Sequence, residues 1–499
     1  MICVSIGRGR HRHMLAEYRH LVEQGAGLVE LRVDYLQSRI NVKRLLQERL
    51  CPVIVSCRRE SDGGKYIGPE EQRLMVLRSA IAEGADYVDL EDDIAAHIPR
   101  FGKTKRIVSL HNFRKTPEDL ALVHARLAAL DPDVIKIATM ANHPHDNVRM
   151  LQMIHDAQIP TLGMCMGEMG TPTRILAGRF GAPFIYSTFH HERAMAPGQL
   201  SYDQMVNLYN YEAIGAETVV FGVIADPIGH SLSPQIHNAA LREAGRNAVY
   251  VPFRVPREDL DQFMDDAPAL GIRGLSVTIP HKEVIAKRLT KVDPAVKGIE
   301  AVNTVVFKGS EVIGYNTDYK AALDALENAL GEVGAQSSPL AGRVTLLLGA
   351  GGVARAVAYG LSRRGAKVIV TSRTRARAES LAFRHGNEVV DWEARHKVNP
   401  DILINCTPVG MHPNVDESPF LKRHLKPSTL VFDTVYNPES TMLIKDARSQ
   451  GCHVVTGVEM FVRQAWLQFK LFTDHEARPG LMREVLKRET GAIKYDPSQ

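Results

Sequence analysis

The chain has 499 residues, of which 44% are hydrophobic, and a net charge of only +4. At roughly 150 residues per domain this length suggests about three domains, and the hydrophobic content is ample for buried cores. A net charge this small, without a long basic block, argues against nucleic acid or a membrane surface as a partner.

The cysteines are scattered, without a Cys-x-x-Cys pair, which argues for reduced thiols and against a zinc cluster. They are Cys3, Cys51, Cys57, Cys165, Cys406 and Cys452. We therefore expect no bound metal. No signal-peptide pattern and no apolar span of about 20 residues is visible, so we expect a cytoplasmic protein.

Short β-rich runs separated by helical patterns fill the first part of the chain. The runs are Ile2–Ile6, Gly27–Val33, Pro52–Cys57, Tyr87–Leu90, Ile107–Leu110, Val134–Ala138, Thr161–Cys165 and Phe184–Ser187. Helices are expected over Glu70–Ala82 and Pro117–Leu130, the second capped by Thr116. Eight β-rich runs that alternate with helical patterns predict a (β/α)8 barrel, and a doubly wound sheet is the alternative.

Unusually polar residues stand at the ends of these strands, where the chemistry of a barrel is located. They include Glu30, Arg32, Arg58, His111 and Lys136. A lysine inside a buried strand is costly unless it is paired or neutral, and a neutral amine can form a Schiff base. The alternative is a lysine at a strand edge whose amine reaches solvent.

Six segments of this region, in chain order, resemble type I 3-dehydroquinate dehydratase and cover nearly all of residues 1–215. They are Glu30–Asp34, Ser56–Gly64, Ser109–Pro117, Asp133–Ala138, Thr173–Gly181 and Ala196–Gln199. The resemblance implies a TIM barrel that joins a lysine to the substrate ketone as an imine. It makes Lys136 the imine lysine and His111 the general acid/base.

By the same resemblance the substrate is held by six residues of the barrel: Glu30, Arg32, Arg58, Asp62, Arg174 and Gln199. Two positions depart from the family pattern. Asp62 stands where the family has a glutamate that orients the histidine, and Met195 stands where it has serine or threonine. A thioether cannot donate a hydrogen bond, so we expect weaker substrate binding with the chemistry intact.

The second half is expected to begin after a helical stretch, Ser201–Glu217, with a new strand at Thr218–Ile224 and a short connection near residues 212–218. Four motifs follow, which place hydroxyls, amides and charges at turns: Asp226–Asn238, Gly274–Glu283, Ala301–Thr304 and Gly314–Asp318. Together they could bind a polyhydroxylated anion. Taken singly, each also fits ordinary turn chemistry.

A strand, a glycine-rich turn and a helix are expected over Val344–Ala358, as in a dinucleotide-binding site. The next strand, Lys367–Thr371, is followed by Arg373 and Arg375 rather than by an acid. Arginines suit a 2′-phosphate, so we expect NADP as the cofactor. The alternatives are an ordinary glycine-rich turn and a solvated basic loop.

From about residue 218 to 475 the chain resembles shikimate dehydrogenase. The resemblance is carried by the four turn motifs, by the glycine-rich segment, and by Asn405–Met411, Asp433–Pro438 and Gly457–Ala465. The resemblance implies Lys282 and Asp318 as the catalytic pair. The substrate-binding residues that it implies are Ser231, Ser233, Thr278, Asn303, Tyr436 and Gln464. The cofactor-binding residues that it implies are Gly349, Ala350, Gly351, Gly352, Val353, Ala354, Ser372, Arg373, Thr374, Arg375, Thr407, Val435 and Gly457. Pro408 and Ser372 replace the serine and asparagine usual in the family.

The expected organisation is α/β throughout: a barrel over 1–215, a substrate domain over 218–325 and a Rossmann domain over 326–461. The C-terminal helices, within 462–499, are expected to return to the substrate domain. The two resemblances imply an enzyme that performs two consecutive shikimate-pathway reactions on small molecules. A monomer and a homodimer are both open as its oligomeric state. A quinate dehydrogenase and a non-catalytic metabolite sensor are the alternatives.

Overall fold

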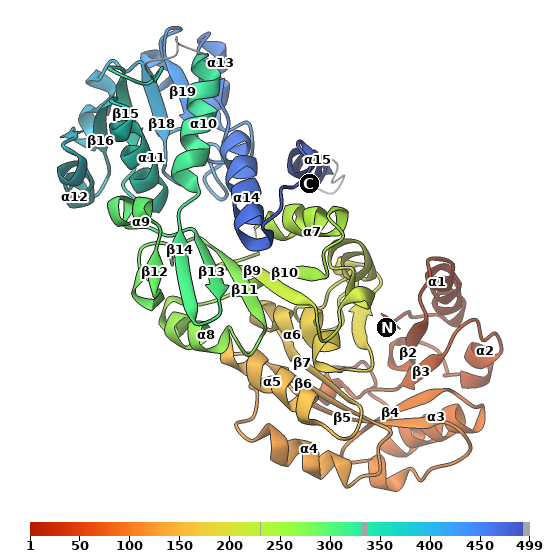
Figure 1. Ribbon diagram of the computed structural model, residues 1–499. Helices are drawn as coiled ribbons and strands as arrows, with labels where there is room; N and C mark the ends of the chain where they lie inside the picture. Colours follow the sequence, from red (N-terminus) through yellow and green to blue (C-terminus); the bar gives the residue numbers. More distant parts are fainter. Residues whose placement is uncertain (230, 332–337, 493–499) are drawn as a thin grey trace. The chain divides into compact units, whose positions relative to one another are not determined.

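The computed structural model describes residues 1–229, 231–331 and 338–492. These residues form an α/β structure with three β-sheets (Figure 1). The chain divides into two compact units. The first comprises Met1–Gly222, Asp226–Ser231 and Asn247–Ile272, and the second comprises Val223–Ala225, Leu232–Arg246 and Arg273–Gln499.

The first sheet has eight strands in the order β7-β6-β5-β4-β3-β2-β1-β8, all paired in parallel. The strands are β1 (Ile2–Ile6), β2 (Leu28–Arg32), β3 (Val53–Ser56), β4 (Tyr87–Glu91), β5 (Lys105–Asn112), β6 (Val134–Met140), β7 (Thr161–Met166) and β8 (Ile185–Thr188). Each predicted strand is present. The predicted (β/α)8 architecture is confirmed as a nearly closed barrel.

The barrel helices are α1 (His11–Glu23), α2 (Val42–Leu46), α3 (Glu70–Ala82), α4 (Leu120–Ala128), α5 (His145–Asp156) and α6 (Thr171–Leu176). They include α3, which coincides with the predicted Glu70–Ala82, and α4, which lies within the predicted Pro117–Leu130. The predicted cap at Thr116 is wrong: Asp119 caps α4, because the Thr116 hydroxyl is held by Thr139 and the Met140 carbonyl. The long helix expected over Ser201–Glu217 is also wrong, since a short π-helix at Gln204–Leu208 and a 3₁₀-helical turn at Tyr211–Ala213 form in its place.

The second sheet has six strands in the order β10-β9-β11-β13-β14-β12 and is mixed, because β13 pairs antiparallel with β11 and β14. Its strands are β9 (Val219–Ala225), β10 (Ala248–Arg254), β11 (Ile272–Val277), β12 (Lys291–Val292), β13 (Thr304–Lys308) and β14 (Glu311–Tyr315). The helices of this region are α7 (Ser233–Glu243), α8 (Leu260–Asp266), α9 (Pro294–Ile299) and α10 (Asp318–Leu330).

The third sheet is parallel, with the order β17-β16-β15-β18-β19-β20. Its strands are β15 (Val344–Leu348), β16 (Lys367–Thr371), β17 (Glu388–Val389), β18 (Ile402–Asn405), β19 (Leu430–Asp433) and β20 (His453–Val455). Its helices are α11 (Gly352–Arg363), α12 (Arg375–His385) and α13 (Met442–Ser449). This is the doubly wound order, whose direction reverses between β15 and β18, where such sheets bind nucleotides.

Both faces of the third sheet are buried, which explains the continuous apolar run of β15. Leu347 packs into one hydrophobic cluster, while Leu346 and Leu348 pack into another on the opposite face. After the sheet, α14 (Gly457–Thr473) and α15 (Leu481–Ala492) follow, and both contact α7.

None of the helices in the described part of the chain is long and apolar enough to cross a lipid bilayer.

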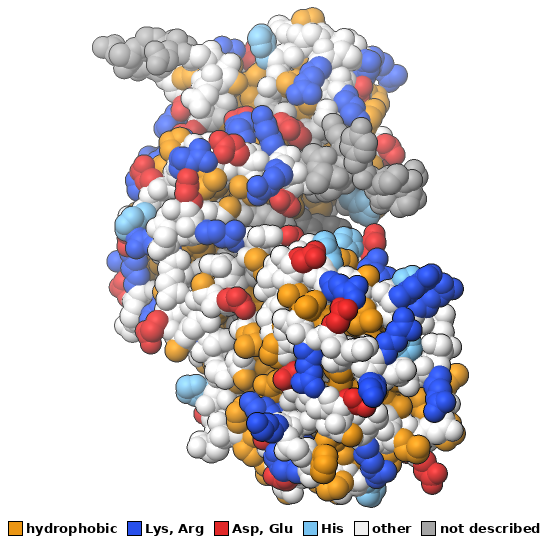
Figure 2. Space-filling view, turned by 90° about the vertical axis from the view of Figure 1, so that its right-hand side faces the viewer, with side chains coloured by type: hydrophobic (Ala, Val, Ile, Leu, Met, Phe, Trp, Pro, Cys, Tyr) orange, Lys and Arg blue, Asp and Glu red, His pale blue; other side chains and the backbone are white. Residues whose placement is uncertain are grey.

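On the face shown in Figure 2, Lys and Arg side chains lie among Asp and Glu side chains.

Candidate active sites

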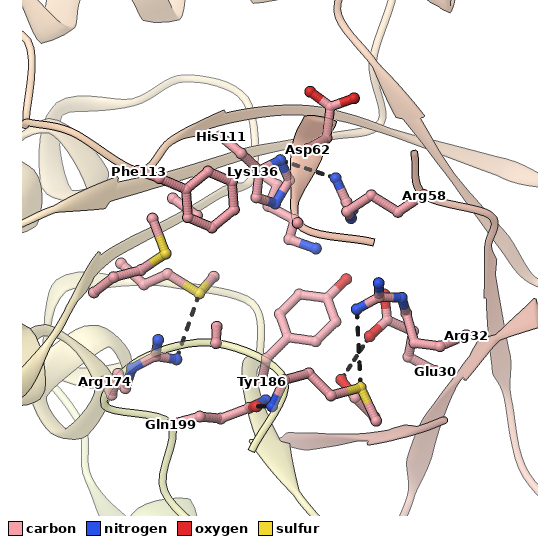
Figure 3. Close-up of a pocket in the computed structure, with 17 residues that line it drawn as sticks. Glu30, Arg32, Arg58, Asp62, His111, Phe113, Lys136, Arg174, Tyr186 and Gln199 are labelled. Atoms are coloured by element: carbon pink, nitrogen blue, oxygen red, sulfur yellow. Dashed lines mark hydrogen bonds between the residues drawn. The ribbon is translucent and has the colours of Figure 1, made fainter. Parts of the chain in front are cut away.

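Every residue predicted to act in the barrel lines one pocket (Figure 3). The sequence-predicted members are Glu30, Arg32, Arg58, Asp62, His111, Lys136, Arg174 and Gln199. They come from positions far apart in the chain, and parallel strands bring their carboxyl ends to one rim. The resemblance therefore selected residues that the fold does bring together.

Lys136 lies on β6 and is buried, and its Nζ donates to Asp89 Oδ2 at 2.8 Å. Asp89 also accepts from Arg58 at 2.9 Å and from Ser109 at 2.6 Å. Burial alone would raise the pKa of Asp89, but Arg58 and Lys136 outweigh burial and hold that pKa well below its usual range. The buried lysine is therefore paired, and its partner escaped the sequence analysis. The available signal was a carboxylate, Asp89, within the predicted strand Tyr87–Leu90.

His111 Nδ1 lies 2.9 Å from Arg58 Nη1. A guanidinium can only donate, so Nδ1 accepts and the neutral ring carries its proton on Nε2. Burial, followed by the charges of Arg58 and Lys136, holds the pKa of His111 well below its usual value. Asp62, which stands where the family has a glutamate that orients this histidine, pairs through its carboxylate with Arg59 at 2.7 Å. Aspartate is one methylene shorter than the glutamate of the family.

Arg174, on α6, is fully buried without a carboxylate partner in the described part of the chain. Its Nη atoms approach only the Met164 sulfur at 3.8 Å and the Pro197 carbonyl at 3.4 Å, and its Nε has no partner there. Burial lowers the pKa of Arg174 to about 10. A buried cation without a counter-ion is costly. The pocket is therefore suited to an anionic ligand such as a carboxylate.

The other polar groups of the pocket are held by neighbouring side chains. Glu30 accepts from Ser5 at 2.5 Å and from Ser56 at 2.7 Å. Arg32 donates to both oxygens of Asp34, at 3.0 and 2.8 Å. Gln199 Oε1 accepts from the Met195 amide at 2.9 Å. These contacts fix the orientation of each group before a ligand arrives.

A second charged cluster lies in the second unit. Lys282 Nζ donates to Asp318 Oδ2 at 2.6 Å. The Asn303 amide donates to Asp318 Oδ1 at 2.9 Å and to the Thr317 hydroxyl at 2.8 Å. Asp318 is the first residue of α10, where the helix dipole favours a carboxylate. A Cβ built on Gly352 would lie 3.2 Å from Lys282 Cβ, so the predicted catalytic lysine borders the glycine-rich turn.

The remaining predicted substrate residues are less closely gathered. Ser233 is the buried first residue of α7, and Thr278 directly follows β11. The Tyr436 ring stacks on Phe461, with the centroids 4.0 Å apart, and Gln464 donates to the Phe461 carbonyl at 3.1 Å. Ser231 belongs to the first unit.

The glycine-rich turn between β15 and α11 has open space beside one of its glycines. Gly349 has a φ of +109°, and a Cβ there would lie 2.9 Å from the Cys406 carbonyl oxygen, so the turn itself requires glycine. Gly351 has an ordinary negative φ, and a Cβ there would meet no atom of the described residues within 4 Å. Neither strain nor packing requires glycine at 351. The space beside it, at the N-terminus of α11, fits a pyrophosphate.

The two arginines after β16 differ in their surroundings. Arg375 pairs with Glu379 at 2.7 Å and also with Asp391. Arg373 is exposed and has no ion pair within residues 338–492. Ser372 Oγ accepts from the Thr374 amide at 3.3 Å, which shapes this loop. Arg373 is therefore the arginine that is available to a 2′-phosphate.

The other predicted cofactor residues surround the same sheet edge. Ala350 and Ala354 are buried, and Val353 packs against the core beside them. The Thr407 hydroxyl donates to Asn405 at 2.7 Å, at the end of β18. A Cβ on Gly457 would lie 2.3 Å from the Val435 carbonyl oxygen, so these two backbones pack directly together.

Family models match most of the chain. The model for type I 3-dehydroquinase matches residues 2–216, and the shikimate dehydrogenase substrate-binding domain matches residues 223–305. The NADP oxidoreductase coenzyme F420-dependent model matches residues 343–435, and the shikimate 5′-dehydrogenase C-terminal domain matches residues 457–487.

The chain is 38% identical to the chloroplastic bifunctional 3-dehydroquinate dehydratase/shikimate dehydrogenase of Arabidopsis thaliana, over 98% of this chain and 84% of the relative. The chain belongs to this bifunctional family. Its dehydrogenase part is 40% identical to the NADP⁺ shikimate dehydrogenase of Methanopyrus kandleri, over 55% of this chain and 97% of the relative. Both families predicted from the sequence, and their order, are confirmed.

Two solved structures resemble the dehydrogenase part. A shikimate dehydrogenase in complex with NADP⁺ aligns with a TM-score of 0.52 and 36% identity, over 55% of this chain and 96% of that structure. A chorismate mutase/shikimate 5-dehydrogenase fusion protein from Clostridium acetobutylicum aligns with a TM-score of 0.51 and 30% identity, over 56% of this chain and all of that structure.

Proposed function

We propose that this chain catalyses two consecutive reactions of the shikimate pathway. The barrel dehydrates 3-dehydroquinate to 3-dehydroshikimate, and the dehydrogenase part reduces that ketone to shikimate with NADPH. The observation that carries the proposal is a lysine–aspartate pair in each part: Lys136 with Asp89, and Lys282 with Asp318. Family membership supports the same pair of activities.

In the barrel, the Lys136 amine attacks the substrate ketone, and loss of water gives an imine that withdraws electrons. His111 then removes the proton next to the imine carbon and returns it to the departing hydroxyl, which leaves as water. Hydrolysis of the imine releases the product. Arg174 binds the substrate carboxylate, because it is a buried cation without a carboxylate counter-ion among the residues that the structure describes.

His111 cannot accept a proton through Nδ1 while Arg58 donates to that nitrogen. Substrate hydroxyls that draw Arg58 away would release Nδ1, and the ring could then change its tautomer. Glu30 and Arg32 hold other ring hydroxyls, and Gln199 holds the loop that follows Met195. Asp62 lies at the rim of the pocket, where its carboxylate pairs with Arg59.

In the dehydrogenase part, NADPH would supply hydride to the ketone carbon. Lys282, oriented by Asp318, gives a proton to the ketone oxygen, and Asn303 holds Asp318 in place. The other substrate contacts are assigned to Ser231, Ser233, Thr278, Tyr436 and Gln464. The turn at Gly349 and Gly351 would hold the pyrophosphate.

A borohydride trap tests the proposal for the barrel. The protein is incubated with 3-dehydroquinate, reduced, digested and analysed by mass spectrometry. We expect a covalent adduct on Lys136, together with NADPH-dependent reduction of 3-dehydroshikimate by the same preparation. NADPH-dependent reduction of 3-dehydroshikimate without an adduct on Lys136 would mean that the chain is a dehydrogenase joined to an inactive barrel. Comparison of kcat/KM for shikimate and quinate tests the quinate alternative.

The pH dependence of the dehydratase is expected to reflect the lowered pKa of His111. Because the neutral ring persists as the pH falls, kcat/KM for 3-dehydroquinate should not decline through His111 between pH 7.5 and 6.5. The measurement is a pH profile of kcat/KM, with dehydrogenase activity recorded in parallel. A decline of kcat/KM toward low pH that sets in at or above pH 6.5, and that comparison with H111N assigns to His111, would contradict this expectation.

The R373A variant is expected to raise the KM for NADPH about tenfold or more, because a charge-assisted hydrogen bond to the 2′-phosphate is lost. The KM for NADH should change little. R375A is the matched control, with a smaller expected effect because Glu379 and Asp391 already engage Arg375. Equal effects of R373A on both cofactors would remove Arg373 from the 2′-phosphate site.

We also propose domain boundaries at residues 215, 325 and 461, and a protein that is a monomer or a homodimer. The proposed cytoplasmic location is supported by the six cysteines, all of which are free thiols. The Arabidopsis relative is named as chloroplastic.

A further inference from the structure

Tyr186 lies on β8 in the wall of the barrel pocket and is only 4% exposed. Its hydroxyl has no hydrogen-bond partner among the residues that the structure describes. Figure 3 shows the ring in the middle of the pocket, with the hydroxyl directed toward the side where Lys136 and Arg58 lie. A buried hydroxyl without a partner is costly unless a ligand or water satisfies it.

The ring of Tyr186 also contacts the proposed imine lysine, since Lys136 Nζ lies 4.1 Å from the ring centroid. A cation at this distance over the face of an aromatic ring is attracted to it. The tyrosine therefore borders the reacting nitrogen, and its hydroxyl extends beyond the ring into the space that a substrate would fill.

Met195 supplies a second, independent observation in the same pocket. Its sulfur lies 3.8 Å from Arg32 Nη1, at the position where the resemblance places serine or threonine. The pocket thus lacks a hydroxyl at position 195 and has an unused hydroxyl at position 186.

We propose that Tyr186 is a substrate-binding residue of the dehydratase site, whose hydroxyl donates a hydrogen bond to an oxygen of the bound hydroxylated ring. It takes the part that a serine or threonine hydroxyl at position 195 would otherwise play. This inference rests on the proposed function of the barrel. Burial raises the pKa of the Tyr186 phenol well above its usual value, so the group acts as a donor and not as a base.

Three variants test the proposal: Y186F, M195S and the double variant Y186F/M195S. We expect Y186F to raise the KM for 3-dehydroquinate about tenfold with little change in kcat, since one neutral hydrogen bond is lost. M195S alone should lower KM about twofold, because Tyr186 already supplies a hydroxyl. In the Y186F background M195S should recover most of the loss.

Y211F is the matched control, because Tyr211 is another buried tyrosine of the first unit that does not line the pocket. It should leave KM unchanged, and all variants should keep wild-type dehydrogenase activity. An unchanged KM in Y186F would overturn the proposal. So would parallel losses in Y186F and Y211F with lowered melting temperatures, which would indicate a structural role.

Calorimetry separates this inference from the proposed function. In the K136M background, which cannot form the imine, Y186F should raise the Kd for 3-dehydroquinate about tenfold. Wild-type protein without dehydratase activity or a borohydride adduct would refute the proposed barrel reaction instead. Equal binding by K136M with and without Y186F would refute the role of Tyr186 whatever the activity.

Discussion

The K136M variant is expected to lose dehydratase activity by about 10⁴-fold or more, because no other side chain replaces the imine-forming amine. The borohydride adduct should disappear with the activity. Methionine nearly matches the length of lysine, and Asp89 keeps its bonds to Arg58 and Ser109, so the barrel should still fold.

The matched control for K136M is K103M, which removes an exposed lysine of the same barrel. It should retain full dehydratase activity. Both variants should reduce 3-dehydroshikimate at the wild-type rate, which tests folding of the rest of the chain. Substantial dehydratase activity in K136M would mean that the reaction proceeds without an imine on this lysine.

The K282M variant is expected to lower kcat for the reduction of 3-dehydroshikimate by about 10³- to 10⁴-fold, because the proton donor for the ketone oxygen is removed. Asp318 would keep its hydrogen bond from Asn303, so the local structure should persist. The KM for NADPH should change far less than kcat. Steady-state kinetics with both substrates varied makes the comparison.

K297M removes an exposed lysine near the end of α9 and serves as the control in the same unit. It should behave as wild type. The dehydratase should be unaffected in both variants, so each active-site substitution controls for the other. A loss in K282M that appears only in the KM for 3-dehydroshikimate would make Lys282 a binding residue and not the proton donor.

The local sequence pattern was sufficient to predict the barrel strands, because buried parallel strands form short apolar runs that are separated by helices. It was not sufficient to predict the residue at which α4 begins. Thr116 fits a cap by its type, but Thr139 and Met140, distant in sequence, take its hydroxyl. Tertiary contacts of this kind are invisible to a rule that considers only neighbouring residues.

The same reason explains the missed site residues. Lys136 was found because a lysine in an apolar strand is conspicuous, whereas Asp89 looked like one polar position of an alternating strand. Only the fold shows that these two side chains meet. Tyr186 was missed because tyrosine is common in strands, and its significance lies in a hydroxyl without a partner.

The unneutralised guanidinium of Arg174 has a practical consequence for handling the protein. Sulfate, phosphate, citrate and similar anions in a buffer should occupy the pocket and compete with the substrate, so measured affinities will depend on the buffer. An anion at 100 times its Kd would also stabilise the folded barrel by about 2.7 kcal/mol. Melting temperatures are therefore comparable between variants only in a buffer of fixed anion content.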